Sequence, residues 1–211
     1  MAQVNDTLEY IFETFSPVKG KKLPYIINDI DRASIPQAMG EMGFKVGAEV
    51  GVAQGIHAQT LCESIPGLKL YCVDVWERYK GYLEYTNRIR QYHRQALRVL
   101  EPYDCEFIKK FSMDAVTDFE DRSLDFVYID AAHDMKNVAC DLWEWSKKVR
   151  YGGIVFGHDY KFYDGVTNKY TVHVRHTVQC YCYVKHIDPW FEVKIPREAS
   201  WMFVRQEGDL V

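Results

Sequence analysis

Short apolar segments alternate with helical patterns through the middle of the sequence, and this alternation constrains the fold more than any other feature. Between the segments, apolar residues recur at helical spacing, as at Ala58, Leu61 and Ile65. Strands that alternate with helices predict a parallel, doubly wound α/β sheet with helices on both faces. The predicted strands are residues 46–50, 70–73, 105–108, 126–129 and 154–156.

The last part of the chain has a different rhythm. Residues 191–195 and 201–204 are two further β patterns, and the segment between them is too short for a helical crossover. We therefore expect these two strands to pair as an antiparallel hairpin. The complete prediction is a Rossmann-like sheet of five parallel strands plus this hairpin, seven strands in all.

The N-terminal part of the chain precedes the alternation. A first helix with Leu8 and Ile11 on one face is expected to begin at an Asp6 cap. A loop over residues 17–33 and a short helix over residues 35–42 follow. We therefore divide the chain into an N-terminal helical cap segment, residues 1–45, and an α/β domain, residues 46–211.

Length and charge exclude several classes of protein. The chain has 211 residues, which suits one domain, and a formal net charge of −4, which argues against extended contact with a nucleic-acid backbone. No apolar segment approaches the roughly 18 residues of a membrane span, and the first residues lack a secretory signal pattern. We therefore expect a cytoplasmic protein without membrane contact, whose six cysteines are free thiols.

Glycines follow the first predicted strand at a turn into a helix. Gly51 and Gly55 there let the backbone approach a ligand closely, and Asp74 at the end of the second strand suits the hydroxyls of a ribose. A dinucleotide fingerprint would need glycines where the chain has Ala53 and Ile56. Glu49 beside the turn would repel phosphates, yet it suits a cofactor that carries an ammonium and a sulfonium.

This arrangement resembles the class I S-adenosylmethionine-dependent methyltransferases. The resemblance rests on Glu49-x-Gly51-x-x-x-Gly55, on Asp74, on Asp130 at the end of the fourth strand, and on the terminal hairpin. It implies that Glu49 and the glycines line the methionine end of the cofactor, that Asp74 holds the ribose, and that Ser112 and Met113 lie at the adenine. The implied cofactor site comprises Glu49, Gly51, Val52, Ala53, Gly55, His57, Asp74, Val75, Ser112, Met113 and Asp130.

Two acidic strand ends point to the reaction site. The segments 128–134 and 157–160 follow the fourth and fifth strands, and both resemble metal-dependent O-methyltransferases that act on small molecules, including the sugars of macrolide antibiotics. Because Asp130 and Asp159 end adjacent parallel strands, their carboxylates can converge on one cation. Oxygen ligands favour Mg²⁺ or Mn²⁺.

His133 is the predicted catalytic base, acting with Asp130. A hydroxyl acceptor is a poor nucleophile until it loses its proton, and a histidine near neutrality can take that proton. An alternative role for His133 is to cap the following helix, although Asp134 is the better N-cap residue. His158 suits either a supporting or a purely structural role.

Alternatives to this function remain open from the sequence. Arg90, Arg94 and Arg98 recur on one helix face and could serve an N- or nucleic-acid methyltransferase, although a solvated face is the simpler interpretation. A non-catalytic binding subunit with the cofactor fold is a further alternative. The expected partners are a small-molecule acceptor and a second copy of the chain in a homodimer. Aromatic residues after the fifth strand suit either a substrate lid or core packing: Tyr160, Phe162, Tyr163 and Tyr170.

Overall fold

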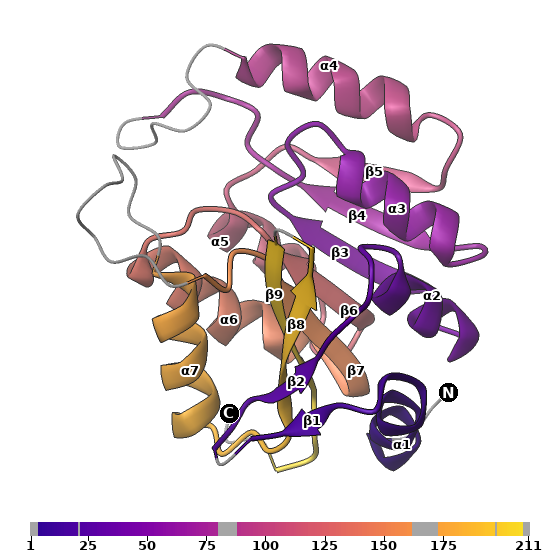
Figure 1. Ribbon diagram of the computed structural model, residues 1–211. Helices are drawn as coiled ribbons and strands as arrows, with labels where there is room; N and C mark the ends of the chain where they lie inside the picture. The colour runs from indigo at the N-terminus through magenta and orange to yellow at the C-terminus, as the bar shows by residue number, and fades with distance from the viewer. Residues whose placement is uncertain (1–3, 21, 80–87, 162–172, 197, 209–211) are drawn as a thin grey trace.

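The structure is a computed structural model that describes residues 4–20, 22–79, 88–161, 173–196 and 198–208. Its centre is one mixed sheet with the strand order β1-β2-β8-β9-β7-β6-β3-β4-β5 (Figure 1). The strands are β1 Val18–Lys19, β2 Tyr25–Ile27, β3 Val46–Val50, β4 Lys69–Val73, β5 Cys105–Ile108, β6 Leu124–Ile129, β7 Val149–Gly157, β8 Trp190–Ile195 and β9 Glu198–Val204.

The parallel part of the sheet confirms the predicted α/β fold. Strands β3 to β7 pair in parallel, with β3 between β4 and β6. β9 runs antiparallel to both β7 and β8, so the predicted terminal hairpin is confirmed as well. The order of the chain reverses between β3 and β6, and such a switch point opens a crevice at the carboxyl ends of the strands.

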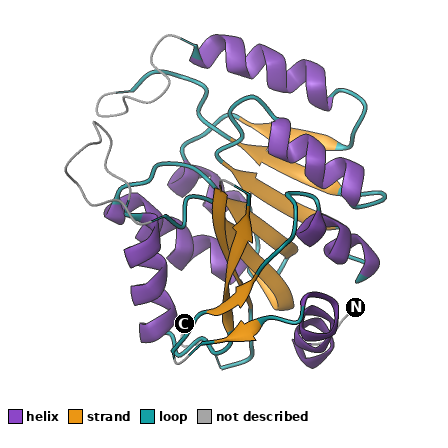
Figure 2. Cartoon of the chain, viewed as in Figure 1, coloured by secondary structure: helices purple, strands orange, loops and turns teal. Residues whose placement is uncertain are grey.

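Helices cover both faces of the sheet (Figure 2). One apolar cluster buries residues of α1 to α4 against the sheet, including Ile11, Met39 and Leu61, and a second buries residues of α5 to α7 against the other face, including Leu142 and Val178. The helices are α1 Val4–Phe15, α2 Ser34–Glu41, α3 Ile56–Ser64, α4 Ile89–Leu100, α5 Ser112–Ala115, α6 Met135–Lys148 and α7 Val174–Val184, with a 3₁₀ turn at Val116–Asp118.

The described part of the chain forms a sheet of nine strands, so the prediction of seven was wrong. The two extra strands, β1 and β2, lie in the segment predicted to be loop. β2 extends the sheet by pairing in parallel with β8, and β1 pairs antiparallel with β2. A strand of two or three residues leaves little periodicity in the sequence. Its pairing partner lies far away in the chain, at Phe191–Val193.

Two predicted element boundaries also differ from the structure. α1 begins at Val4, so Asp6 lies within its first turn and is not its cap. The helical pattern over residues 138–149 predicts a stop at Gly152 and Gly153, but α6 ends at Lys148 and both glycines lie inside the long strand β7. A Cβ on Gly153 would lie 2.3 Å from the carbonyl oxygen of Asp125, so close approach to β6 explains this glycine.

Within the described residues, no helix combines the length and the apolar composition that crossing a membrane requires. The six cysteines are free thiols, as predicted, and two of them, Cys72 and Cys182, are buried.

Candidate active site

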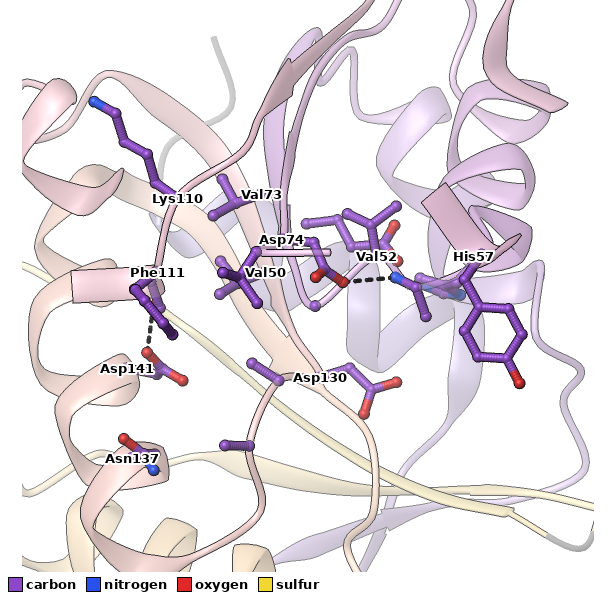
Figure 3. Close-up of a pocket in the computed structure, with 18 of the residues that line it drawn as sticks. Val50, Val52, His57, Val73, Asp74, Lys110, Phe111, Asp130, Asn137 and Asp141 are labelled. Carbon is purple, nitrogen blue, oxygen red and sulfur yellow. Dashed lines mark hydrogen bonds between the residues drawn. The ribbon is translucent and has the colours of Figure 1, made fainter. Parts of the chain in front are cut away.

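A cavity of about 500 Å³ opens at the carboxyl ends of the parallel strands (Figure 3). That volume is in the range of small-molecule and cofactor sites. All of the predicted cofactor residues except Gly55 line it: Glu49, Gly51, Val52, Ala53, His57, Asp74, Val75, Ser112, Met113 and Asp130. The fold therefore brings residues from four strand ends to one cavity, although cofactor contact itself stays a prediction.

Gly51 makes the close turn after β3. Its φ of 95° is unfavourable for other residues, and a Cβ there would lie 2.1 Å from the carbonyl oxygen of Asp130. Gly55 does not line the cavity, and its predicted contact with the cofactor stays a prediction. It occupies the N-cap of α3 with a φ of 79°, and a Cβ there would lie 3.1 Å from Cα of Ala96. Gly55 thus lets α3 and α4 pack closely behind the cavity wall.

Asp74 is held by the backbone of the turn. Its Oδ2 accepts a hydrogen bond from the Ala53 amide at 2.9 Å, and its Oδ1 accepts one from the Trp76 amide at 2.8 Å. Burial raises the pKa of this carboxyl, and these amide donors oppose the shift. Because each carboxylate oxygen has a further lone pair, Asp74 can still accept from two ligand hydroxyls.

Glu49 is a buried acid with an unused acceptor. It is 2% exposed, and its Oε2 has no hydrogen-bond partner among the described residues. Burial raises its pKa well above the ordinary value, and the nearby charges of Asp130 and Asp74 raise it further. A cationic group bound in the cavity would stabilise the charged form of Glu49 and so lower its pKa.

His57 stacks on Tyr128 beside this acid, with ring centroids 3.8 Å apart. Burial lowers the pKa of His57 to about 3, and the nearby Arg32 adds to this effect. The imidazole is therefore neutral at pH 7, and neither ring nitrogen has a hydrogen-bond partner among the described residues. His57 can accept or donate one hydrogen bond toward the cavity.

Asp130, His133 and Asp159 meet at the ends of β6 and β7. Nε2 of His133 lies 3.3 Å from Oδ1 of Asp130 and 3.2 Å from Oδ2 of Asp159. One ligand atom from each residue falls within 4.8 Å of the others, so the three side chains can hold a metal ion. The adjacency of the two acids agrees with the strand order. His133 was predicted to act with Asp130, but its approach to Asp159 was not predicted, because that contact depends on the loop between β6 and α6.

A series of charged side chains extends from Asp159 through His158 and Glu198 to Arg32. Nδ1 of His158 lies 3.5 Å from Asp159 Oδ1, and its Nε2 lies 3.4 Å from Glu198, which pairs with Arg32. Burial lowers the pKa of His158, but the hydrogen bond with Asp159 and the surrounding acids raise it more, so the net shift is upward. The structure thus places His158 as a neighbour of the acidic pair.

The positions of the other candidate residues decide between the roles that the sequence left open for them. Asp134 is the N-cap of α6, accepting from the amides of Lys136 and Asn137, so His133 does not cap this helix. Tyr160 is 1% exposed and packs edge-on against Trp190, which places it in the core and not in a lid. Arg90, Arg94 and Arg98 are exposed on α4. Phe162, Tyr163 and Tyr170 lie outside the described residues.

Asp141 and Arg32 are two of the cavity residues that sequence reasoning missed. Asp141 lies among the apolar residues of α6, and a charged side chain on a buried helix face is a recognisable signal. Arg32, in the segment before α2, lines the same cavity. No local pattern marks Arg32, because its position depends on how the N-terminal segment folds back onto the sheet.

The sheet order, the reversed strand β9 and the cavity at the switch point define the class I methyltransferase fold. A family model described as a methyltransferase domain matches residues 48–160. The chain therefore belongs to the methyltransferase domain family and is an enzyme of the S-adenosylmethionine-dependent class. A comparison with curated protein sequences gave no match.

Solved structures with the same fold are distant in sequence. The chain is similar to an O-methyltransferase from Bacillus cereus in complex with S-adenosylhomocysteine, with 15% identity, a TM-score of 0.60, and coverage of 93% of this chain and 96% of that chain. It is also similar to the O-methyltransferase of tomaymycin synthesis from Streptomyces achromogenes in complex with S-adenosylmethionine. That match has 13% identity, a TM-score of 0.59, and coverage of 97% and 99%. At these identities, the likeness concerns the fold.

Proposed function

We propose that this enzyme transfers the methyl group of S-adenosylmethionine to a hydroxyl of a small molecule, with a sugar or glycoside as the preferred acceptor class. We further propose that a divalent cation held at Asp130, His133 and Asp159 assists the transfer. Both solved structures described above are named as O-methyltransferases, and this supports the choice of oxygen as the acceptor atom.

The observation that carries the proposal is the concentration of acids around one cavity. Glu49, Asp74 and Asp130 all line it, and the charges of Asp74 and Asp130 raise the pKa of Glu49. Such a site repels a pyrophosphate and attracts a cation. S-adenosylmethionine carries an ammonium and a sulfonium, so its charges match the acids, whereas those of a dinucleotide do not.

The polar groups of the cavity fit the parts of this cofactor. The unpartnered Oε2 of Glu49 can accept from the ammonium, and Asp74 keeps two acceptor positions for the ribose hydroxyls. Gly51 leaves the backbone open where a side chain would collide with Asp130. S-adenosylmethionine supplies the methyl group, and these residues would orient it.

A cation at the acidic pair would supply the activation that a hydroxyl needs. A bound divalent metal lowers the pKa of a hydroxyl that contacts it and fixes its position. Asp130 and Asp159 would hold the cation through oxygen, and the same charge would remove the repulsion between the two acids. Asp130 also lines the main cavity, so the acceptor would lie beside the cofactor.

Two roles are compatible with the position of His133. Its Nε2 faces both acids, which suits a nitrogen ligand that completes the donor set with Asp130 and Asp159. As the general base, the same ring would have to direct a free nitrogen at the acceptor hydroxyl. The distances support the ligand role, and the base role stays a prediction that kinetics can test.

Calorimetry tests the cofactor assignment directly. S-adenosylhomocysteine should bind, and NAD should not bind measurably. Asp74→Ala should weaken binding by about 1.5–3 kcal/mol, the scale of hydrogen bonds to a charged group. The matched control is Asp104→Ala, whose carboxylate is exposed and pairs with Lys69, and this change should leave affinity unchanged. Tight binding of NAD without a response to S-adenosylhomocysteine would refute the proposal.

A second measurement tests the acceptor. Transfer of a labelled methyl group from S-adenosylmethionine should be detected on small hydroxylated compounds, with sugars and glycosides preferred. Transfer confined to amines or to nucleic acid would contradict the proposal. The small-molecule acceptor, the cytoplasmic location and the homodimer remain predictions from the sequence.

A further inference from the structure

Three of the six cysteines converge on one face of the sheet, although they come from three different elements. Cys62 lies on α3, Cys72 on β4, and Cys105 is the first residue of β5 (Figure 1). The Sγ atoms of Cys62 and Cys105 are 3.6 Å apart, whereas 43 positions separate these residues in the sequence. Cys72 lies on the strand beside β5 and also hydrogen-bonds with Cys105. The proposed reaction uses none of these sulfurs.

The three thiols differ in their access to solvent. Cys72 is fully buried, whereas Cys62 and Cys105 are each partly exposed. Oxidation of cysteine depends on exposure as well as on thiolate character. A solute as small as a peroxide can therefore reach the pair formed by Cys62 and Cys105, whereas Cys72 is shielded from it.

The neighbours of Cys105 favour its thiolate. Hydrogen bonds from the Cys62 and Cys72 thiols lower the pKa of Cys105, and the charge of Lys69 adds to this effect, although burial opposes it. The hydrogen bond with Cys105 and burial raise the pKa of Cys62. The thiolate is the nucleophilic form of cysteine. Cys105 is therefore the attacking sulfur of the pair, and Cys62 stays a thiol beside it.

We infer that Cys62 and Cys105 are a reversible oxidation site, which forms a disulfide when it meets a peroxide. The Cys105 thiolate attacks one peroxide oxygen, so that an S–O bond forms, the O–O bond breaks and hydroxide leaves. Cys62 then loses its proton, and its sulfur displaces the hydroxyl from Cys105, so that an S–S bond forms and water leaves. The two sulfurs together give two electrons to the peroxide. A thiol reductant returns these electrons and restores both thiols.

The position of the pair determines what the bond would do. A disulfide has an S–S length of about 2.0 Å, so the two sulfurs must approach by roughly 1.5 Å, a distance that rotation of the side chains can supply. Cys105 begins β5, whereas the main cavity lies at the carboxyl ends of the strands. The bond would therefore join α3 to β5 at the end of the sheet away from the cavity. Oxidation should stabilise the fold without filling the cavity.

Peptide mapping by mass spectrometry tests the inference on the folded protein. The protein is treated with a stoichiometric amount of hydrogen peroxide, the remaining thiols are alkylated, and the digest is compared with a sample reduced by dithiothreitol. We expect a linked pair of peptides that contain Cys62 and Cys105, and this pair should disappear on reduction. Because the bond closes a long loop, the oxidised protein should unfold at a temperature about 4–12 °C higher than the reduced protein.

Variants separate the attacking sulfur from its partner. Cys62→Ser should give no linked pair, and Cys105 should stop at the sulfenic acid, which dimedone traps. The matched control is Cys180→Ser, which removes an exposed cysteine of α7 and should leave the linked pair unchanged.

Three results would overturn the inference. They are a link between Cys72 and Cys105 in place of the expected one, irreversible oxidation of Cys105 without any link, and an oxidised wild-type protein that unfolds at the same or a lower temperature. The wild-type protein alone decides the matter if Cys62→Ser does not fold. Because no cofactor takes part, the outcome is independent of the proposed function.

Discussion

At the scale of single residues, His133 has two candidate roles, metal ligand and general base, that experiment must distinguish. Its Nε2 contacts two acids that end neighbouring strands. We expect His133→Ala to lower turnover by about 10²–10⁴-fold and to leave S-adenosylhomocysteine affinity nearly unchanged, because the residue does not line the cofactor cavity. Steady-state kinetics and calorimetry measure the two effects.

The metal dependence of that variant separates the two roles. A lost ligand should be compensated in part by a higher metal concentration, whereas a lost base should not. His186→Asn is a suitable control, because His186 is exposed after α7 and asparagine tolerates its positive φ of 55°. Near-normal turnover of His133→Ala would remove the residue from the reaction altogether.

The ionisation of Asp141 predicts how the free energy of unfolding changes with pH, and this prediction involves no ligand. Its pKa is about 7 in the folded chain, mainly because of burial, against an ordinary value of about 3.9 for an unfolded chain. Between these values the folded state keeps a proton that the unfolded state has released. Stability therefore falls as pH rises through about 4 to 7.

Asp141→Asn should remove this loss, because asparagine does not ionise. We expect the stabilisation by Asp141→Asn to be about 2–3 kcal/mol larger at pH 8 than at pH 5. Urea unfolding at the two pH values measures the difference, with Asp114→Asn as the exposed control. A gain of equal size at both pH values would show that Asp141 does not titrate between them.

At the scale of elements, the turn between β3 and α3 is a tightly constrained junction. Gly51→Ala would place a Cβ 2.1 Å from the Asp130 carbonyl oxygen at a φ of 95°. We expect it to lower the free energy of unfolding by at least about 3 kcal/mol, because backbone strain and steric overlap act together. Affinity for S-adenosylhomocysteine should fall in the same variant.

Gly43→Ala is the matched control for this change. Gly43 follows α2 with a φ of 79°, but a Cβ there has no neighbour within 4 Å. Gly43→Ala should lower the free energy of unfolding by only about 1–2 kcal/mol, because only the left-handed backbone is unfavourable for alanine there. Cofactor affinity should be unchanged. If both variants lost the same free energy of unfolding, a small shift of the turn would have removed the overlap with Asp130.

The elements that sequence reasoning found are those whose signal is local. Strands β3, β4 and β6 are mostly buried, so each is an apolar segment of the right length, and Asp130 and Asp159 could be paired because their strands are neighbours. β1 and β2 were missed because distant pairing with β8 stabilises them. The contacts of His133 and Asp141 depend on side-chain directions that spacing alone does not give.

At the scale of the whole molecule, the sheet gathers acids from strands that are far apart in the sequence. Glu49 comes from β3, Asp74 follows β4, Asp130 follows β6 and Asp159 follows β7. The parallel order of these strands puts their carboxyl ends at one edge. The fold thus concentrates acidic side chains at one place, and the cationic ligands proposed above would balance their charge.

The metal is the prediction that depends on this whole arrangement. Asp130 and Asp159 supply oxygen ligands and His133 supplies a nitrogen within reach of both. Carboxylates suit Mg²⁺ and Mn²⁺, and an imidazole shifts the preference toward Mn²⁺. We expect EDTA to abolish methyl transfer and Mn²⁺ to restore it at least as well as Mg²⁺.

Asp159→Asn should raise the metal concentration needed for half-maximal activity, because it removes one charge from the site while keeping its shape. The matched control is Asp121→Asn, since Asp121 is an exposed acid that pairs with Lys148, and neither residue lines the cofactor cavity. S-adenosylhomocysteine affinity should be similar in both variants, because Asp159 does not line the cofactor cavity. Full activity in EDTA, with unchanged metal response in Asp159→Asn, would eliminate the cation. Activation of the hydroxyl would then rest on His133, whose neutral ring would take the proton and become a cation between the two acids.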